Sequence, residues 1–136
     1  KVQGIDYSAV SVEKARKVNA SAIAAGRCAV RQASVAELPF EAEQFDVVTA
    51  FETVYFWPEL AQNFKEVYRV LKPGGTFFIC NEANGETAKD DKWTQIIDGM
   101  TIYTDTALKT YLEQAGFCKI QSHKNKKGWL CVTAQK

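Results

Sequence analysis

Two acidic residues in this sequence directly follow or end stretches that favour β-strands. Asp6 ends the first stretch, 1–6 (KVQGID), with Tyr7 next to it, and Glu52 follows the second stretch, 45–51 (FDVVTAF). Ligands of open α/β sheets bind beyond the carboxyl ends of the strands, so both acids are candidates for binding. A carboxylate in that position can accept hydrogen bonds from both hydroxyls of a ribose. Asp6 could equally be a solvated strand end or a cap for the helix that follows.

Three aromatic residues come shortly after the second acid. They are Tyr55, Phe56 and Trp57. The face of an aromatic ring attracts cations, so these side chains could contact a positively charged group bound beside the strand end. The alternative is packing beneath the next helix, which we expect to account for at least one of the three. Glu52 could balance a bound positive charge, orient a substrate or remain solvated.

The strand, helix and strand around these residues form the best-defined unit of the chain. The apolar run 45–51 favours a strand buried on both faces of a parallel sheet. The stretch 58–71 begins with a proline and repeats apolar residues at helical spacing. Lys-Pro-Gly-Gly at 72–75 then predicts a tight turn before a strand over 76–80. A parallel connection of this kind is almost always right-handed.

The other expected elements alternate in the same way. Ser8 is the predicted N-cap of a helix over 9–25 that Gly26 ends. Strands and helices in alternation predict an α/β fold with a doubly wound, mostly parallel sheet, and the last two strands should form an antiparallel hairpin. The remaining predictions are a strand over 28–33, a loop over 34–44, an amphipathic helix through Trp93, Ile96, Ile97 and Met100, a helix that Thr104 or Asp105 caps and Gly116 ends, and hairpin strands over 117–123 and 129–134.

Two motifs carry a family resemblance. ELPFEAEQFDVVTAF precedes RVLKPGGTFFI in the order and at the separation seen in the middle of class I S-adenosylmethionine-dependent methyltransferases. The pair is similar, more narrowly, to the small-molecule branch that includes quinone-biosynthesis C-methyltransferases. The alternative is a generic α/β unit with a tight turn, because one fold hosts many functions. The resemblance implies a Rossmann-like methyltransferase fold and S-adenosylmethionine as cofactor.

The resemblance also implies roles for individual residues. Asp6, which ends the strand at 1–6, is expected to bind the cofactor ribose. The loop that follows the strand at 28–33 is expected to bind the adenine. That loop has Ser34 where the family usually has Asp, so the hydrogen bond to the adenine amino group should be weaker, and Glu37 could substitute for it. The cofactor-binding candidates are Asp6, Tyr7, Ser34, Val35, Ala36, Phe51 and Glu52, and the substrate candidates are Tyr55, Phe56 and Trp57.

The glycine-rich turn of the family, G-x-G-x-G, does not occur in this sequence. The chain begins at Lys1, within an expected strand, and its only methionine is Met100. We therefore expect residues 1–136 to be an N-terminally truncated methyltransferase domain that lacks the central strand and half of the cofactor site, and to be inactive alone. The strands at 1–6 and 45–51 would then have unpaired edges, which could pair with each other or form a homodimer.

Composition excludes several other functions. The 136 residues carry 17 basic and 16 acidic side chains, which gives a net charge of +1 and no basic footprint for nucleic acid. No apolar run approaches the roughly 20 residues of a membrane span, and no signal peptide is visible, so a cytoplasmic location is expected. The four cysteines, Cys28, Cys80, Cys118 and Cys131, favour buried thiols in a reducing compartment over a disulfide framework or a metal site.

The sequence thus predicts a methyltransferase that acts on a small molecule. Residues 81–104, polar first and then apolar, are expected to form a mobile substrate cap that excludes water. His123, between lysines at a hairpin end, is expected to have no catalytic role. The alternative is a non-catalytic methyltransferase-like domain that serves as a scaffold or interaction module.

Overall fold

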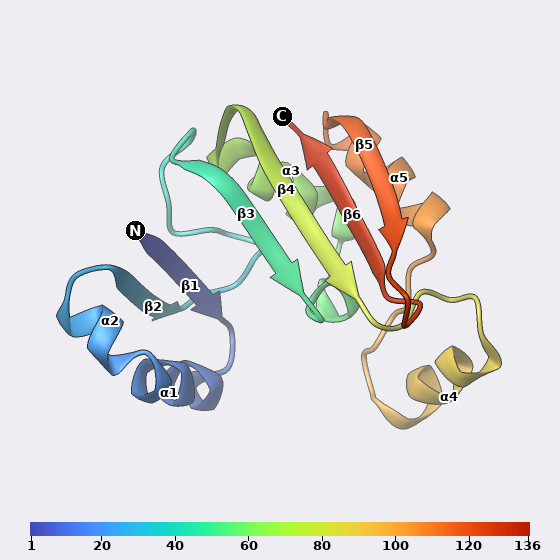
Figure 1. Cartoon of the computed structure of the whole chain (residues 1–136), viewed down its shortest axis with the longest axis horizontal. Coiled ribbons are helices and arrows are strands. Elements are labelled where there is room, and N and C mark those ends of the chain that lie inside the picture. The colour runs from blue at the N-terminus through green and yellow to red at the C-terminus, as the bar shows by residue number, and fades with distance from the viewer. The chain divides into compact units, whose positions relative to one another are not determined.

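The computed structural model describes the backbone of all 136 residues and every side chain except those of Ala88, Lys89 and Asp91 (Figure 1). The chain divides into two compact units, Lys1–Pro39 and Phe40–Lys136, and each is described by itself. Within the described part of the chain, no helix is long and apolar enough to cross a membrane.

The first unit is a small two-stranded parallel sheet with its helices. Each residue of β1 pairs in register with one of β2, from Val2 opposite Cys28 to Asp6 opposite Gln32. The backbone hydrogen bonding continues one residue past β2, because Ala33 N donates to Asp6 O at 3.0 Å. The elements are β1 (Val2–Asp6), α1 (Ala9–Val18), α2 (Ala20–Ala24) and β2 (Cys28–Gln32).

The helix predicted over 9–25 is interrupted at Asn19. Its ends are as expected, because Ser8 Oγ accepts from Ser11 N at 3.3 Å and Gly26 has a φ of 68°. The interior prediction is wrong, because Asn19 leaves helical geometry at φ −100° and ψ 15°. Its side-chain amide donates to Ala15 O at 2.9 Å, and asparagine side chains compete for helix carbonyls in this way.

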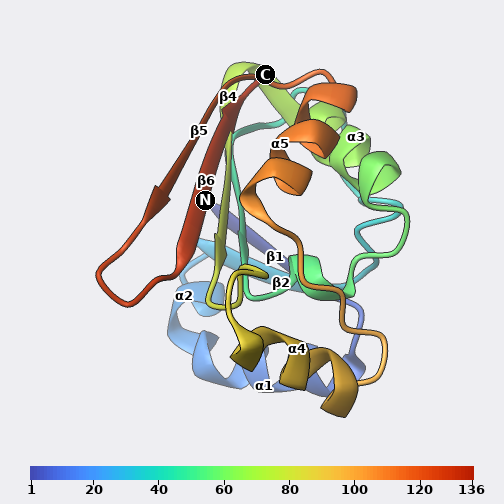
Figure 2. The same cartoon turned by 90° about the vertical axis from the view of Figure 1, so that its right-hand side faces the viewer.

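The second unit is a four-stranded mixed sheet in the order β3-β4-β6-β5. β3 and β4 are parallel, whereas β6 runs antiparallel to both β4 and β5, which confirms the predicted C-terminal hairpin. Figure 2 shows α3 and α5 together on one side of this sheet. The elements are β3 (Phe45–Phe51), the 3-10 helix η1 (Val54–Phe56), α3 (Leu60–Val70), β4 (Leu71–Asn81), α4 (Ala88–Ile96), α5 (Asp105–Gln114), β5 (Cys118–Lys124) and β6 (Leu130–Gln135).

The Lys-Pro-Gly-Gly turn lies inside β4, where it interrupts the pairing of β4 with β3. Phe45 is opposite Leu71, but Val47 is already opposite Thr76, so residues 72–75 loop out of the ladder. A Cβ atom on Gly75 would lie only 2.9 Å from the Lys72 carbonyl oxygen, so the backbone approaches too closely for any side chain. The predicted turn is confirmed.

The core of this unit is the helix-covered face of the sheet. Phe77 of β4 is fully buried and packs against Phe64, Trp57 and Phe117, with ring centroids 5.5–6.2 Å apart. The apolar stripe predicted for α3 faces this core, which explains why that helix forms over a sequence of moderate overall hydrophobicity.

The expectation that β3 is buried on both faces is wrong. Ala50 is buried, but Val47 and Phe51 are each 57% exposed. These two side chains lie on the sheet face opposite the one that Ala50 shares with the helices, because side chains alternate along a strand. Phe51 instead makes an edge contact with Phe78 of β4, at 5.5 Å between centroids.

The apolar stripe predicted through Trp93 and Met100 does not form one helical face. α4 ends before Ile97, which has extended backbone, and Met100 lies beyond that end. Trp93 and Ile96 are 48% and 61% exposed. The four apolar residues are therefore divided between α4 and the turn after it. Gly99, which lies between Ile97 and Met100, has a left-handed φ of 74° and is part of that turn.

Candidate functional site

Glu52 is held across the carboxyl ends of β3 and β4. Its φ of 56° is left-handed, a conformation that costs energy for a residue with a side chain. Its amide donates to the Cys80 carbonyl at 3.0 Å, and its Oε1 accepts from the Glu82 amide at 2.5 Å. The carboxylate is thus fixed at the carboxyl ends of the two strands, where the sequence predicts a binding group.

Burial raises the pKa of the Glu52 carboxyl, although the hydrogen bond from the Glu82 amide opposes the shift. A group whose pKa is higher in the folded state than in the unfolded state stabilises the fold at low pH. This stabilisation is lost as the pH rises through the pKa of the folded state. Glu52 is therefore protonated more readily than an ordinary glutamate, and its ionised form is the destabilised one.

We expect Glu52→Gln to stabilise the unit at neutral pH relative to the unsubstituted protein, with no such gain below the ordinary glutamate pKa near 4.5. The glutamine oxygen can still accept from the Glu82 amide. Urea unfolding of both proteins across pH 4–7.5 measures the difference. Glu113→Gln, exposed on α5, is the control for removing one negative charge. A pH-independent difference for Glu52→Gln would contradict the prediction.

The three aromatic candidates occupy different environments. Tyr55 is 3% exposed, and its hydroxyl accepts from Ala83 N at 2.9 Å and donates to Ala83 O at 3.2 Å. Burial raises its pKa. Trp57 stacks on Phe77 at 6.2 Å, whereas Phe56 is 42% exposed. Core packing therefore accounts for Tyr55 and Trp57, and Phe56 presents the accessible ring.

Asn81, the last residue of β4, was not recognised in the sequence. It is completely buried, and neither its side-chain nitrogen nor its side-chain oxygen has a hydrogen-bond partner in the described part of the chain. The available signal was periodicity: Phe77, Ile79 and Asn81 alternate onto one face, and the third is polar. Such a group calls for an explanation, because buried polar atoms are rarely unpaired.

Asp90 anchors the loop between β4 and α4. Its Oδ2 accepts from the amides of Gly85 at 2.9 Å, Asn84 at 3.3 Å and Thr87 at 3.4 Å, and the residue is 7% exposed. Asp90 lies within residues 81–104, the expected cap. The spacing Thr87-x-x-Asp90 was the missed signal, since the pair forms a capping box at the start of α4.

The cofactor candidates of the first unit gather at the carboxyl ends of β1 and β2. Asp6 Oδ1 accepts from Ser8 N at 2.8 Å, so the capping role is present. Gln32 Nε2 donates to Tyr7 O at 3.0 Å and ties the two strand ends together. Ser34 Oγ accepts from Ala36 N at 3.1 Å and shapes the following turn. Phe51, Glu52 and the aromatic candidates belong to the second unit.

Comparisons with known proteins agree on one family. A family described as "Methyltransferase domain" matches residues 1–79. A ubiquinone/menaquinone biosynthesis C-methyltransferase of Geotalea daltonii is 36% identical over 78 residues, which are 57% of this chain and 33% of that protein. A 24-methylenesterol C-methyltransferase of Arabidopsis thaliana is 31% identical over 101 residues, 73% of this chain and 28% of that protein. The chain thus spans about a third of these relatives.

A solved structure shows the same fold. It is a putative methyltransferase of Haloferax volcanii in complex with the methyltransferase activator Trm112, with a TM-score of 0.86 at 20% identity, covering 98% of this chain and 70% of that one. This likeness agrees with the Rossmann-like methyltransferase fold that the resemblance implies. Because the family matches more than half of the chain, this protein belongs to the methyltransferase domain family, in the class I group whose cofactor is S-adenosylmethionine.

Proposed function

We propose that this chain acts in S-adenosylmethionine-dependent methyl transfer to a small-molecule acceptor. The observation that carries the proposal is the position of the Asp6 carboxylate. It lies at the carboxyl end of β1, uses one carboxylate oxygen for Ser8 N, and keeps the other without a protein partner in the described part of the chain. Ser34, two residues beyond the end of β2, adds a hydroxyl.

These groups fit the adenosine part of the cofactor. A carboxylate oxygen accepts hydrogen bonds from ribose hydroxyls, and the Ser34 hydroxyl can accept from an amino group in place of the usual aspartate. Tyr7 is 74% exposed, so its ring is available to the ligand. The backbone amide of Val35 is a further candidate for an adenine ring nitrogen.

The cofactor supplies a methyl group on a positively charged sulfur. Glu52 is proposed to balance that charge, because its carboxylate is fixed by the Glu82 amide. Phe51, directly before it, is 57% exposed and offers an aromatic face to a cation. Neither residue needs to move a proton when the leaving thioether is neutral, so alignment of donor and acceptor supplies much of the acceleration.

The acceptor is proposed to be small and mainly apolar. The curated relatives are named for ubiquinone/menaquinone biosynthesis and for a sterol, and quinones of this kind and sterols share that character. In this chain, the exposed ring of Phe56 provides an apolar contact, and the buried amide of Asn81 provides one donor and one acceptor. Residues 81–104 are proposed to cap the acceptor and exclude water.

Replacing Asp6 by asparagine should weaken S-adenosylmethionine binding about tenfold, at the lower end of the effect of a hydrogen bond to a charged group. The asparagine oxygen can still cap Ser8, so the local fold should be retained. Calorimetry on the full-length protein measures the affinity. Asp46→Asn is the control, because that carboxylate is paired with Lys72 at 2.8 Å on the surface of the other unit. Unchanged affinity of Asp6→Asn would remove Asp6 from the site.

The second candidate is a non-catalytic methyltransferase-like module. Ser34 in place of an acidic residue favours it, because an uncharged acceptor binds adenine more weakly. β1 and β3 each have one strand partner in the described chain, so a homodimer through their free edges stays a prediction. Failure of the full-length protein to bind S-adenosylmethionine would support the module over the enzyme.

A further inference from the structure

Cys80 and Cys131 lie directly opposite each other on the antiparallel strands β4 and β6. Their sulfur atoms are 3.5 Å apart, and both cysteines are free. We propose that these two residues form a redox-active dithiol, which a small disulfide such as glutathione disulfide converts into an intramolecular disulfide. This inference is independent of the proposed methyl transfer.

The backbone already has the geometry of a cross-strand disulfide. Residues directly opposite in an antiparallel pair have Cα atoms about 4.5–5.5 Å apart, within the range of about 4.4–6.8 Å found for disulfides. The sulfurs must approach by about 1.5 Å to reach the S–S bond length of about 2.05 Å. Side-chain rotation can provide this movement, because both strands have partners on each side and keep their register.

The two thiols differ in accessibility. Cys80 is 8% exposed, and burial together with the neighbouring thiol raises its pKa to about 11. Cys131 is half-buried and therefore more open to a reagent from solution. We expect Cys131 to react first and Cys80 to act second, at a sulfur that it already contacts.

The exchange balances without any further reactant. Cys131 loses its proton to solvent, and its sulfur attacks one sulfur of glutathione disulfide, which releases one glutathione thiolate and leaves a mixed disulfide. Cys80 then transfers its proton to solvent and attacks the Cys131 sulfur, which releases the second glutathione. Two cysteine thiols are oxidised, and one glutathione disulfide is reduced to two glutathione molecules.

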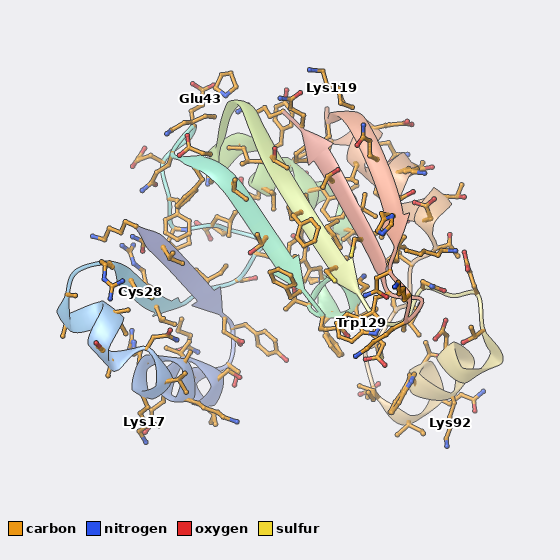
Figure 3. The ribbon with its side chains drawn as sticks, viewed as in Figure 1. Lys17, Cys28, Glu43, Lys92, Lys119 and Trp129 are labelled. Atoms are coloured by element: carbon orange, nitrogen blue, oxygen red, sulfur yellow. The ribbon has the colours of Figure 1, made fainter. Side chains whose placement is uncertain are left out.

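The other two cysteines serve as internal controls. Cys118 is exposed on β5, and Cys28, labelled in Figure 3, is half-buried on β2 of the first unit. Neither has a sulfur partner in the described part of the chain. The four sequence positions contain no short cysteine spacing, so the Cys80–Cys131 pair is apparent only from the strand register.

The disulfide would fix the strand end that carries the candidate site. The Cys80 carbonyl accepts from the Glu52 amide at 3.0 Å, and Asn81 is the next residue of β4. A covalent link from β4 to β6 at this point should slow hydrogen exchange of the backbone amides that follow Cys80. Oxidation would thereby reduce opening of the segment that leads into residues 81–104.

The test is equilibration of the protein with mixtures of reduced and oxidised glutathione, followed by acid quenching, alkylation and peptide mass spectrometry. With the oxidised form in excess, we expect most molecules to contain the Cys80–Cys131 disulfide, and Cys28→Ser and Cys118→Ser to behave in the same way. Cys80→Ser should stop at a Cys131–glutathione mixed disulfide.

Two outcomes would overturn the proposal. One is a stable Cys131–glutathione adduct in the unsubstituted protein, with Cys80 still alkylated. The other is complete alkylation of Cys80 and Cys131 under conditions in which exposed Cys118 carries glutathione. Both are read from the unsubstituted chain, so they do not depend on whether a serine variant folds.

Discussion

Asp90→Ala should lower the free energy needed to open the loop at residues 84–87 by about 3 kcal/mol. The Asp90 carboxylate accepts from the amides of Asn84, Gly85 and Thr87, and it is almost completely buried. Alanine leaves all three donors without that acceptor, and each hydrogen bond to a charged group contributes about 1.5–3 kcal/mol when taken alone. The three contributions are not additive, because they share one oxygen atom.

Hydrogen exchange of those three amides measures the effect. We expect it to accelerate by roughly 100-fold, which corresponds to about 3 kcal/mol. Asp98→Ala is the matched control, because Asp98 is an exposed acid in the same segment. Asp90→Asn, which keeps one side-chain oxygen, should fall between the two. Equal exchange in Asp90→Ala and Asp98→Ala would show that the carboxylate does not hold the loop.

The anchor at Asp90 refines the expectation of a mobile cap at residues 81–104. The segment is attached at its ends: Ala83 is bonded to the Tyr55 hydroxyl, and Thr101 N donates to Tyr55 O at 2.9 Å. Between these points, α4 exposes Trp93 and Ile96. We therefore infer that α4 moves when the cap opens, while the two attachment points at Ala83 and Thr101 stay fixed. The strand ends at Glu52 would then keep their position.

Local patterns were sufficient for most of the elements. The apolar stripe of α3, the Ser8 cap and the 72–75 turn depend on residues near one another in the chain, and the structure has all of them. The helix over 9–25 was too long because a side-chain bond from Asn19 to a backbone carbonyl competes with helix propagation. β3 was predicted to be buried on both faces because it is an apolar run. Such a run does not show which faces of the sheet are covered by other elements.

The candidate site was less accessible to sequence reasoning. Asp6 and Glu52 became candidates because they end or follow strand patterns, and strand ends are where α/β proteins bind ligands. Asn81 and Asp90 have weaker signals in the sequence, an alternation of side chains for Asn81 and a Thr-x-x-Asp spacing for Asp90, and their burial is set by residues distant in sequence. The fold is what shows that both side chains are buried, unlike the solvated polar residues nearby.

Asn81→Val should raise the free energy of unfolding by about 1–3 kcal/mol, the cost of keeping a buried polar group without a hydrogen bond. Valine removes both unpaired atoms of Asn81, has a similar size and favours strands. Urea unfolding measures the change. The matched control is Asn63→Val, because Asn63 is equally buried but its amide donates to the Pro58 carbonyl. That substitution should destabilise the protein, with a small part of the loss due to helix propensity.

A loss of stability in Asn81→Val comparable to that in Asn63→Val would mean that the Asn81 amide has a partner in solution, such as a bound water. The expected gain would have a different meaning. Substitution of a binding residue can stabilise a natural protein, because a group kept ready for a ligand is unsatisfied without it. Asn81 ends β4, the strand that contains the Lys-Pro-Gly-Gly turn, and lies next to Cys80, whose carbonyl accepts from the Glu52 amide. A donor and an acceptor kept there at a cost in stability favour direct recognition of a polar group on the methyl acceptor.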